Sequence, residues 1–272
     1  MASIERRAFS LGWVIVSYFL VCGGMMIAIA VAAALEVHTR AINYGLLAGG
    51  AAIGGFFSGR ASPHRSFLEP AIAGVLVVGS LVLFLWQTSV GTMLLPREQV
   101  LRAAPVIGGI VFAGGLGGAI FGELSAPDMV SHSRLRWMGM TWLITAGALL
   151  AALIVTHVLL VDSALRAGGA FKLWQSGELI TADQLGRAIL LAMAAAAAIG
   201  GFVTQAAAPD RMLLSVAAAV LVGYAAALAA LSYYVGPIDR VALQGIATLA
   251  GGGGVLAFVG AFFGWILDRL TE

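Results

Sequence analysis

The stretch AIGGFFSGRASPHRSFL at residues 52–68 returns as AIGGFVTQAAAPDRMLL at residues 198–214, with nine of the seventeen positions identical. In both copies a glycine pair lies near the end of an apolar run, a proline follows, and an arginine precedes the next apolar run. Because proline interrupts a helix, each copy is typical of a helix, a turn and the start of another helix. The repeated turn therefore predicts two copies of one helical unit.

The composition around these turns is that of a membrane protein. Hydrophobic residues make up 61% of the 272 residues, charged residues make up 10%, and the mean hydropathy is +0.99. Soluble domains carry about 25% charged residues, because a water-facing surface needs them. The sequence therefore predicts an integral membrane protein in contact with a lipid bilayer. A net charge of +2 and the lack of a basic tail argue against nucleic-acid binding.

Eight apolar segments are long enough to cross the hydrocarbon core as helices, which takes about 20 residues. We expect these helices near residues 9–35, 42–59, 68–94, 103–124, 137–161, 186–206, 212–235 and 242–267. Long runs without alternation favour helices over the short strands of a membrane barrel. The expected fold class is an all-α polytopic integral membrane protein with eight transmembrane helices.

The two halves also match outside the repeated turn. Examples are Trp13 with Trp142, Pro96 with Pro237, and Gly118 with Gly260. We expect residues 1–130 and residues 131–272 to form two tandem four-helix repeats, the second with a longer loop at 162–185. An even number of spans in each repeat gives both the same, parallel orientation in the membrane.

Glycines recur at four-residue spacing on several predicted spans, a glycine-zipper pattern that stacks them on one helix face. In lipid, such faces let helix backbones approach closely, and this close packing drives helix association. The glycines expected to pack helices are Gly54, Gly55, Gly59, Gly114, Gly118, Gly122, Gly200, Gly201, Gly260 and Gly264. These faces either hold the chain together or bind another subunit, and the sequence does not separate the two.

Four polar residues are candidates for a function, since ionisable groups inside a membrane are costly and usually functional. Glu69 and Glu123 lie at span ends from which they can be drawn inward. His157 is the most interior titratable residue, and it either hydrogen-bonds a neighbouring helix or serves as a ligand or proton relay. Gln244 is a milder polar group within the last span, suited to bonding across helices or to lining a polar path.

Familiar chemistries find no matching set of residues. Zinc needs about three clustered ligands and haem needs facing axial ligands, but His157 alone among the four histidines falls inside a predicted span. No base and orienting group accompany a serine or cysteine, as nucleophilic catalysis requires. We therefore expect no catalytic residue, no metal and no cofactor, and a non-enzymatic role.

Two arginines, Arg65 and Arg211, fall at matching positions just outside the predicted hydrocarbon core. They are expected to contact lipid phosphates or the carbonyls at the turn, with ligand binding as the alternative. The short loops on the N-terminal side carry slightly more arginine than those on the other side, which favours a cytoplasmic N-terminus.

The segment Gly54–Arg60, followed by Ala71–Gly74, resembles a GGFxAGR-type turn of uncharacterised small bacterial four-helix membrane proteins. The likeness covers one helix hairpin. In the second copy of the turn, Gln205 and Ala206 replace the last glycine and the arginine. The resemblance implies four-helix units, and it implies no particular activity. The expected location is a bacterial inner membrane.

These features together favour a non-enzymatic accessory or scaffold subunit of a larger membrane complex, with protein partners in the membrane. The reasons are the small-residue helix faces, the short loops and the lack of a chemical site. One alternative is a passive channel or transporter with a path between the two repeats. The other is a quinone- or lipid-binding subunit of a redox complex, with His157 and Tyr18 as the residues to test.

Overall fold

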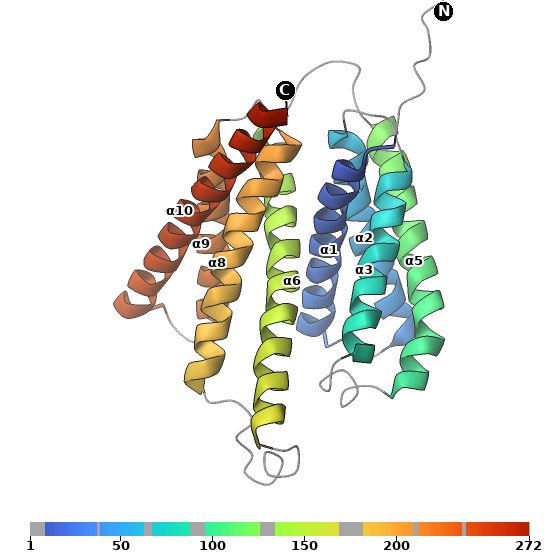
Figure 1. Ribbon diagram of the computed structural model, residues 1–272, viewed down its shortest axis with the longest axis horizontal. Helices are drawn as coiled ribbons and strands as arrows, with labels where there is room; N and C mark the ends of the chain where they lie inside the picture. The colour runs from blue at the N-terminus through green and yellow to red at the C-terminus, as the bar shows by residue number, and fades with distance from the viewer. Residues whose placement is uncertain are drawn as a thin grey trace, which may run out of the picture. The chain divides into compact units, whose positions relative to one another are not determined.

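A computed structural model describes residues 9–36, 39–62, 67–87, 96–125, 134–168, 182–208, 212–235 and 238–271. Within these ranges the chain is all-helical, and eight helices are long and apolar enough to cross a membrane (Figure 1). They are α1 (Leu11–Ala34), α2 (Arg40–Ala61), α3 (Leu68–Gln87), α5 (Arg97–Leu124), α6 (Arg134–Gly168), α8 (Ala182–Ala207), α9 (Leu213–Val235) and α10 (Arg240–Thr271). The prediction of an all-α chain with eight membrane-length helices is confirmed.

Several helices extend beyond the ranges that the hydropathy of the sequence predicts, among them α5 and α6. Helix α5 begins at Arg97 rather than near 103, and Pro105 therefore lies inside it. Helix α6 continues to Gly168, although a loop was expected from residue 162. At 35 residues α6 is about 52 Å long, well beyond a hydrocarbon core of about 30 Å. Hydropathy predicts only the part of a helix that contacts lipid. The backbone hydrogen bonds of the helix can continue beyond that part into the polar region.

Helix ends coincide with residues that do not continue a helix. Helix α1 ends at Ala34, and Glu36 then has a φ of 48°, the left-handed conformation that commonly closes helices. Ser62 caps α2 by donating its backbone N–H to the carbonyl of Ser58, directly before Pro63 in the sequence. These endings are local, so they are readable from the sequence around each turn.

The chain divides into two compact units, Met1–His132 and Ser133–Glu272. In the first unit α1 packs on α2 and α3, and α5 packs on the same two helices, so the ring order is α1, α2, α5, α3. In the second unit the same rule gives the ring order α6, α8, α10, α9. The second and fourth helices of each unit are therefore direct neighbours.

The interface between α2 and α5 brings two backbones together with almost no side chain between them. The two helices run in the same direction, because successive glycines of α5 meet successive turns of α2. A Cβ added to Gly114, Gly118 or Gly122 would collide with the backbone carbonyl of Ala48, Ala52 or Phe56, respectively. From the other side, Gly55 and Gly59 leave no room against the backbone of Gly115 and Ala119.

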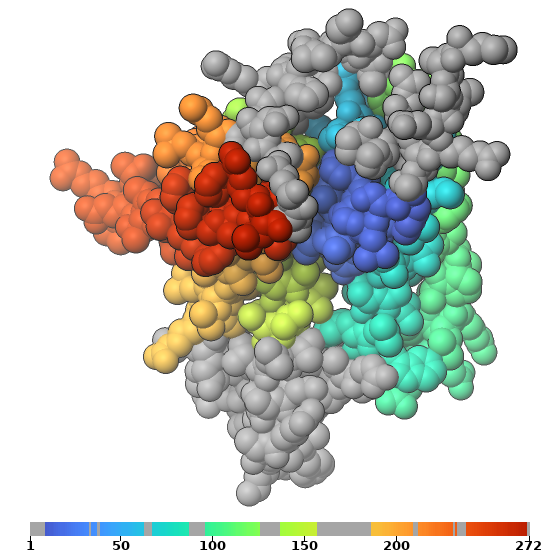
Figure 2. All heavy atoms as spheres, turned by 45° about the horizontal axis from the view of Figure 1, so that its top comes forward, coloured from blue at the N-terminus to red at the C-terminus, as the bar shows by residue number. Residues whose placement is uncertain are grey.

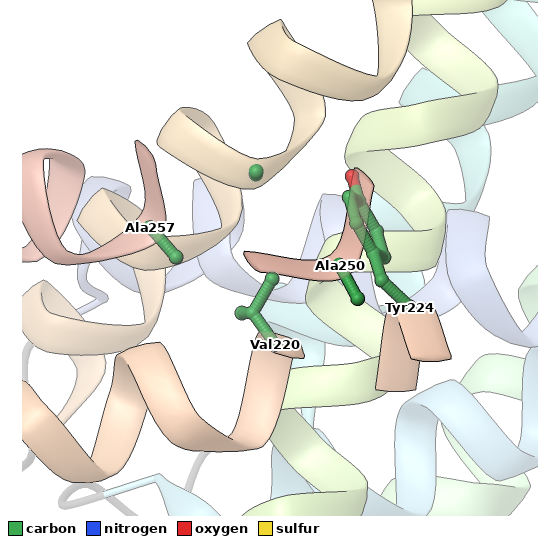
Figure 3. Close-up of a cluster of buried hydrophobic side chains, with 5 residues drawn as sticks. Val220, Tyr224, Ala250 and Ala257 are labelled. Atoms are coloured by element: carbon green, nitrogen blue, oxygen red, sulfur yellow. The ribbon is translucent and has the colours of Figure 1, made fainter. Parts of the chain in front are cut away.

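The second unit adds a small cluster of buried side chains to its glycine contacts. Val220 and Tyr224 of α9 meet Ala250 and Ala257 of α10, together with Ala197 of α8 (Figure 3). The Tyr224 hydroxyl donates a hydrogen bond of 2.8 Å to the carbonyl of Met193 on α8. One tyrosine thus joins three helices of this unit. Nearby, Gly201 packs on Ala257, Gly260 packs on Ala198, and Gly264 packs on Phe202.

The outside of the helices is largely apolar. Ile15, Leu83, Phe121 and Val255 each expose more than half of their surface. Figure 2 shows the atoms of α3 (teal) and α5 (green) in contact along one edge of the first unit. Exposed apolar surface of this extent suits contact with lipid. Arginines at helix ends lie over aromatic rings at 5.5–5.8 Å, a typical interfacial anchor: Arg60 over Phe56, Arg97 over Trp86 and Arg269 over Trp265.

Candidate functional site

Buried polar side chains gather in one half of each unit. In both units this is the half where the first helix begins, the second ends and the third begins. In the described part of the chain, the buried Ser, Thr, Gln and Glu side chains are Ser17, Ser58, Glu69, Thr141, Thr145, Thr204 and Gln205. Among the described residues of the opposite half, the buried side chains are mainly apolar or small, so the buried polar candidates lie in the polar half.

Glu69, the second residue of α3, is the most unusual member of this set. Its side chain is 0% exposed, and its Oε1 accepts a hydrogen bond of 3.3 Å from the backbone N–H of Ser10, just before α1. Its Oε2 is buried and has no hydrogen-bond partner among the residues that the structure describes. The next residue, Pro70, places its carbonyl 3.1 Å from where a Cβ of Gly115 would stand on α5. Glu69 therefore lies where α1, α3 and α5 converge.

A pair of hydroxyls links α1 to α2 deeper in the same unit. Ser17 Oγ and Ser58 Oγ lie 2.6 Å apart, and both residues are fully buried. The second unit is arranged differently. Thr141 donates its hydroxyl to the carbonyl of Trp137 on its own helix, at 3.1 Å, and the buried hydroxyl of Thr204 has no partner among the described residues.

One aromatic side chain in each unit reaches from the first helix to the third. The Tyr18 hydroxyl on α1 lies 2.9 Å from Ser80 Oγ on α3. Trp142 on α6 donates its indole N–H to the carbonyl of Ala219 on α9, at 2.8 Å. The Trp142 ring also occupies the space that Gly223 leaves open. These bonds hold the third helix of each unit against the first.

Of the four polar candidates, two lie in the first unit and two in the second. Glu69 and Glu123 belong to the same end of the first unit, where Glu123 lies in the last turn of α5 and is partly buried. Gln244 is exposed on α10 in the second unit, and its backbone carbonyl accepts a hydrogen bond of 2.9 Å from Thr248 Oγ1. His157 lies on α6, and its side chain falls outside the described residues. Arg65 and Arg211 also fall outside them.

The ten candidate glycines all lie at contacts between helices. At each of them an added Cβ would come closer than 3.0 Å to an atom of a neighbouring helix. Gly54 faces the backbone of Leu20 and Val21 on α1, and Gly200 faces Thr145 on α6. The other eight belong to the α2–α5 and α8–α10 contacts described above. Within each unit, these positions admit no larger side chain without moving a helix.

Three serines that take part in the polar contacts were not predicted from the sequence. Ser10 and Ser80 are single residues with no pattern around them. Ser58 carried a signal, because the repeated turn has a hydroxyl at this position in both copies, as Thr204 in the second. A hydroxyl retained where the rest of the turn varies indicates a buried polar contact.

The described residues contain no group of three or more His, Cys, Asp or Glu side chains that could hold a metal ion. Cys22 is a buried cysteine within α1. What the polar half of the first unit offers chemically is therefore a buried carboxylate and a hydroxyl pair. Comparisons of the whole chain with protein-family models, with curated proteins and with solved structures gave no match.

Proposed function

We propose that the chain is a non-enzymatic accessory or scaffold subunit of a larger membrane complex. The observation that carries this proposal is an open face on the first half of α10. Gln244, Gly245, Thr248 and Gly252 are exposed and, at three- and four-residue spacing, lie on one face of the helix. A Cβ added to Gly245 or Gly252 would meet nothing within 4 Å. We name these four residues the open face.

The second half of α10 shows what a lipid-facing surface looks like on the same helix. There the same face carries Val255, Val259, Phe262 and Phe263, all exposed. Large apolar side chains suit contact with acyl chains, whereas glycines suit the close approach of another helix. The exposed amide of Gln244 adds a group that can hydrogen-bond a partner within the membrane. A partner helix on the open face would use the kind of contact that α10 makes with α8.

A crosslinking experiment tests this proposal directly. A photo-reactive amino acid replaces Gly252, cells are irradiated, and the crosslinked species are identified by mass spectrometry. The matched control carries the same group at Phe263, on the same face of α10. Crosslinks from position 252 to a different membrane protein, absent from position 263, support the accessory role. Crosslinks to lipid alone from both positions would sink it.

A passive channel or transporter is the second candidate, with a path between the two units. It is favoured by the exposure of Gln244 and Thr248, since polar groups are poorly placed against lipid. Crosslinks from position 252 to residues 1–132 of the same chain would favour this candidate over the first. Solute flux into liposomes, compared between the wild type and Gln244→Leu, then tests it. For the redox alternative, Tyr18 is already engaged with Ser80, and the His157 side chain lies outside the described residues.

We further propose that the two units are copies of one four-helix unit. Matching contacts between the second and fourth helices support this. Gly55 packs on Gly115 and Gly201 packs on Ala257, while Gly118 packs on Ala52 and Gly260 packs on Ala198. The residue numbers differ by 146 for the second helices (201 and 55, 198 and 52) and by 142 for the fourth (257 and 115, 260 and 118). A constant difference on each helix is expected of a duplicated interface.

The first helices match in a different register from the one the sequence suggests. Trp13 is 6% exposed and Trp142 is 41% exposed, so the two tryptophans are not equivalent. Trp142 instead takes the role of Tyr18, which also bonds the third helix. In this register Thr141 falls on Ser17, a difference of 124 rather than 129, and both residues are buried polar groups. We therefore propose that Trp142 corresponds to Tyr18 rather than to Trp13.

Duplication with four spans in each copy gives both units the same orientation, with the N-terminus proposed on the cytoplasmic side of a bacterial inner membrane. The turn after α2 and the turn after α8 then face the cytoplasm. Reporter fusions at Ser62 and Ala208, active only on one side of the membrane, test this. Opposite sides for the two positions would contradict the parallel arrangement.

A further inference from the structure

We propose that Gly251 and Gly252 form a hinge in α10, about which the first half of the helix, residues 240–250, moves relative to the second half. The second half stays fixed on α8 and α9. Because the first half carries most of the open face, the motion changes what Gln244 and Thr248 contact. The proposal goes beyond the accessory role, since the motion requires no partner subunit.

Four consecutive glycines, residues 251–254, lie in the middle of α10. Two of them are explained by packing, because a Cβ added to Gly253 or Gly254 would press on side chains of α9, among them the Tyr224 ring. A Cβ added to Gly251 or Gly252 would meet nothing within 4 Å. Gly251 also lies outside the open face, so neither close packing within the unit nor a partner at that face explains it.

Two adjacent glycines without packing contacts make a helix easy to bend. Glycine has no Cβ, adopts a wide range of backbone conformations and is the poorest helix former after proline. Sharp bends in helices occur at such residues. In membranes, a glycine on a helix usually allows a neighbouring helix to approach, which then supports the backbone at that point. Gly251 and Gly252 have no such support within the unit, so α10 bends most easily there.

The two halves of α10 are held in place to different extents. Within residues 240–250 only Ile246 and Ala250 are buried, and Ala250 lies beside the Tyr224 ring (Figure 3). A movement of this half therefore uncovers two side chains. The second half packs its backbone against the backbone of α8, so it cannot move without separating the two helices. Its buried residues are Gly253, Gly254, Ala257, Gly260, Ala261 and Gly264.

The first unit has a similar weak point in α5. Pro105 lies inside this helix and cannot donate a backbone hydrogen bond, and a Cβ added to Gly109 would meet nothing within 4 Å. Gly109 and Gly251 differ by 142 in residue number, as the matching contacts of α5 and α10 do. The close contacts of α5 with the backbone of α2 begin only later, at Gly114. An open glycine at this position in both units is expected if the fourth helix bends in each of them.

Distances between pairs of spin labels test the hinge in the full chain, purified alone and reconstituted in lipid nanodiscs. One sample carries Val241→Cys with Leu191→Cys, and the other carries Phe263→Cys with Leu191→Cys, both in a Cys22→Ala background. The three labelled positions are 75%, 65% and 59% exposed for Val241, Leu191 and Phe263, respectively, so a label fits at each. Pulsed electron paramagnetic resonance gives the distribution of distances. We expect a wider distribution for the first pair than for the second.

Substitutions at the hinge should remove this difference. Gly251→Ala and Gly252→Ala, singly and together, should narrow the distribution of the first pair, because alanine favours the helix and both positions have open space. The distribution of the second pair should not change. Gly245→Ala is the matched control, since it also replaces an open glycine of α10, and it should leave both distributions unchanged.

Three results would overturn the proposal. The first is an equally narrow distribution for both pairs in the chain without hinge substitutions. The second is a wide distribution that persists when Gly251 and Gly252 are both replaced. The third is a narrowing by Gly245→Ala as large as that by Gly252→Ala, because the first half would then be flexible throughout rather than at one point. Circular dichroism of every variant checks that the helices are intact.

Discussion

The two units share their glycine contacts and differ in their buried polar groups. Between the second and fourth helices, glycine meets backbone in both: Gly118 on Ala52 and Gly260 on Ala198. Between the first and second helices, Ser17 and Ser58 bond to each other in one unit, whereas Thr204 in the other has no partner among the described residues. Where two backbones touch, only glycine fits. A buried hydroxyl can form its hydrogen bond with several kinds of partner, so the polar contacts can differ between the two units.

The same contrast holds at the start of the third helix. Glu69 is fully buried, while Ser215 is exposed. The surrounding helices have the same ring order in both units, so the fold does not require the carboxylate. A buried charge that the fold does not require is better explained by a function.

The largest expected effect comes from filling the shared glycine contacts. Gly118→Leu and Gly260→Leu should each lower the free energy of unfolding by about 3 kcal/mol, the upper part of the usual range for overpacking, because a backbone carbonyl blocks the new side chain. Gly117→Leu and Gly252→Leu are the matched controls, since a Cβ at either position meets nothing within 4 Å. Unfolding in detergent, followed by circular dichroism, measures the difference. Equal effects for Gly118→Leu and Gly117→Leu would mean that α2 and α5 are not in close contact.

Removal of a buried hydroxyl should change the free energy of unfolding in opposite directions in the two units. Ser58→Ala removes the bond to Ser17 and leaves a buried hydroxyl unpaired, so it should destabilise the chain by about 1 kcal/mol. Thr204→Val keeps the shape and removes a buried hydroxyl without a partner, so it should stabilise the chain by about 1 kcal/mol. Thermal unfolding of both variants in one detergent checks the signs. Destabilisation by Thr204→Val would show that its hydroxyl has a partner in the membrane.

A smaller effect is expected from the aromatic links to the third helix. Trp142→Phe loses a 2.8 Å hydrogen bond and part of the ring against Gly223, and should cost about 1 kcal/mol. Tyr18→Phe loses a partly exposed bond to Ser80 and should cost about 0.5 kcal/mol. Protection from limited proteolysis at the third helices reports both. A larger loss of stability in Tyr18→Phe than in Trp142→Phe would contradict the proposed correspondence of the two residues.

The smallest effect belongs to the residue that replaces Glu69 in the second unit. Ser215→Ala changes an exposed hydroxyl with a local bond, and should alter the free energy of unfolding by less than about 0.5 kcal/mol. Denaturation by a graded detergent mixture suffices to detect a change outside this range. A cost above 1 kcal/mol would show that the start of α9 is buried in the intact protein, as the start of α3 is.

Much of the helix count follows from composition, because about 20 apolar residues suffice for one span. The extensions of α5 to Arg97 and of α6 to Gly168 do not follow, since they depend on backbone bonds outside the apolar core. The helix-facing role of Gly118 is suggested by its spacing alone. That Gly252 lies open is visible only once the neighbours of α10 are known.

The sequence predicts Glu69 as a candidate residue, but it does not predict the burial and the contacts of its side chain. Glu69 stands near a span end in the sequence, which is compatible with exposure as well as burial. Its carboxylate is bonded by the backbone N–H of Ser10, 59 residues away, and the next residue, Pro70, packs against Gly115 on α5. The Ser17–Ser58 pair likewise joins residues 41 positions apart. Contacts between distant residues leave no periodic pattern, so local sequence cannot reveal them.

The ring order of each unit has a consequence for how the chain is made. Synthesis delivers α1 and α2 first, and they join through Gly24 and Gly50. The tightest partner of α2 is α5, which leaves the ribosome only after α3. Until α5 is made, Gly55 and Gly59 lack the helix that covers them in the folded unit. The same delay occurs in the second unit, where α8 is made before its partner α10. A nascent chain that stops before Arg97 or before Arg240 keeps this glycine face of α2 or α8 uncovered, and we expect such a chain to be a substrate for membrane quality control.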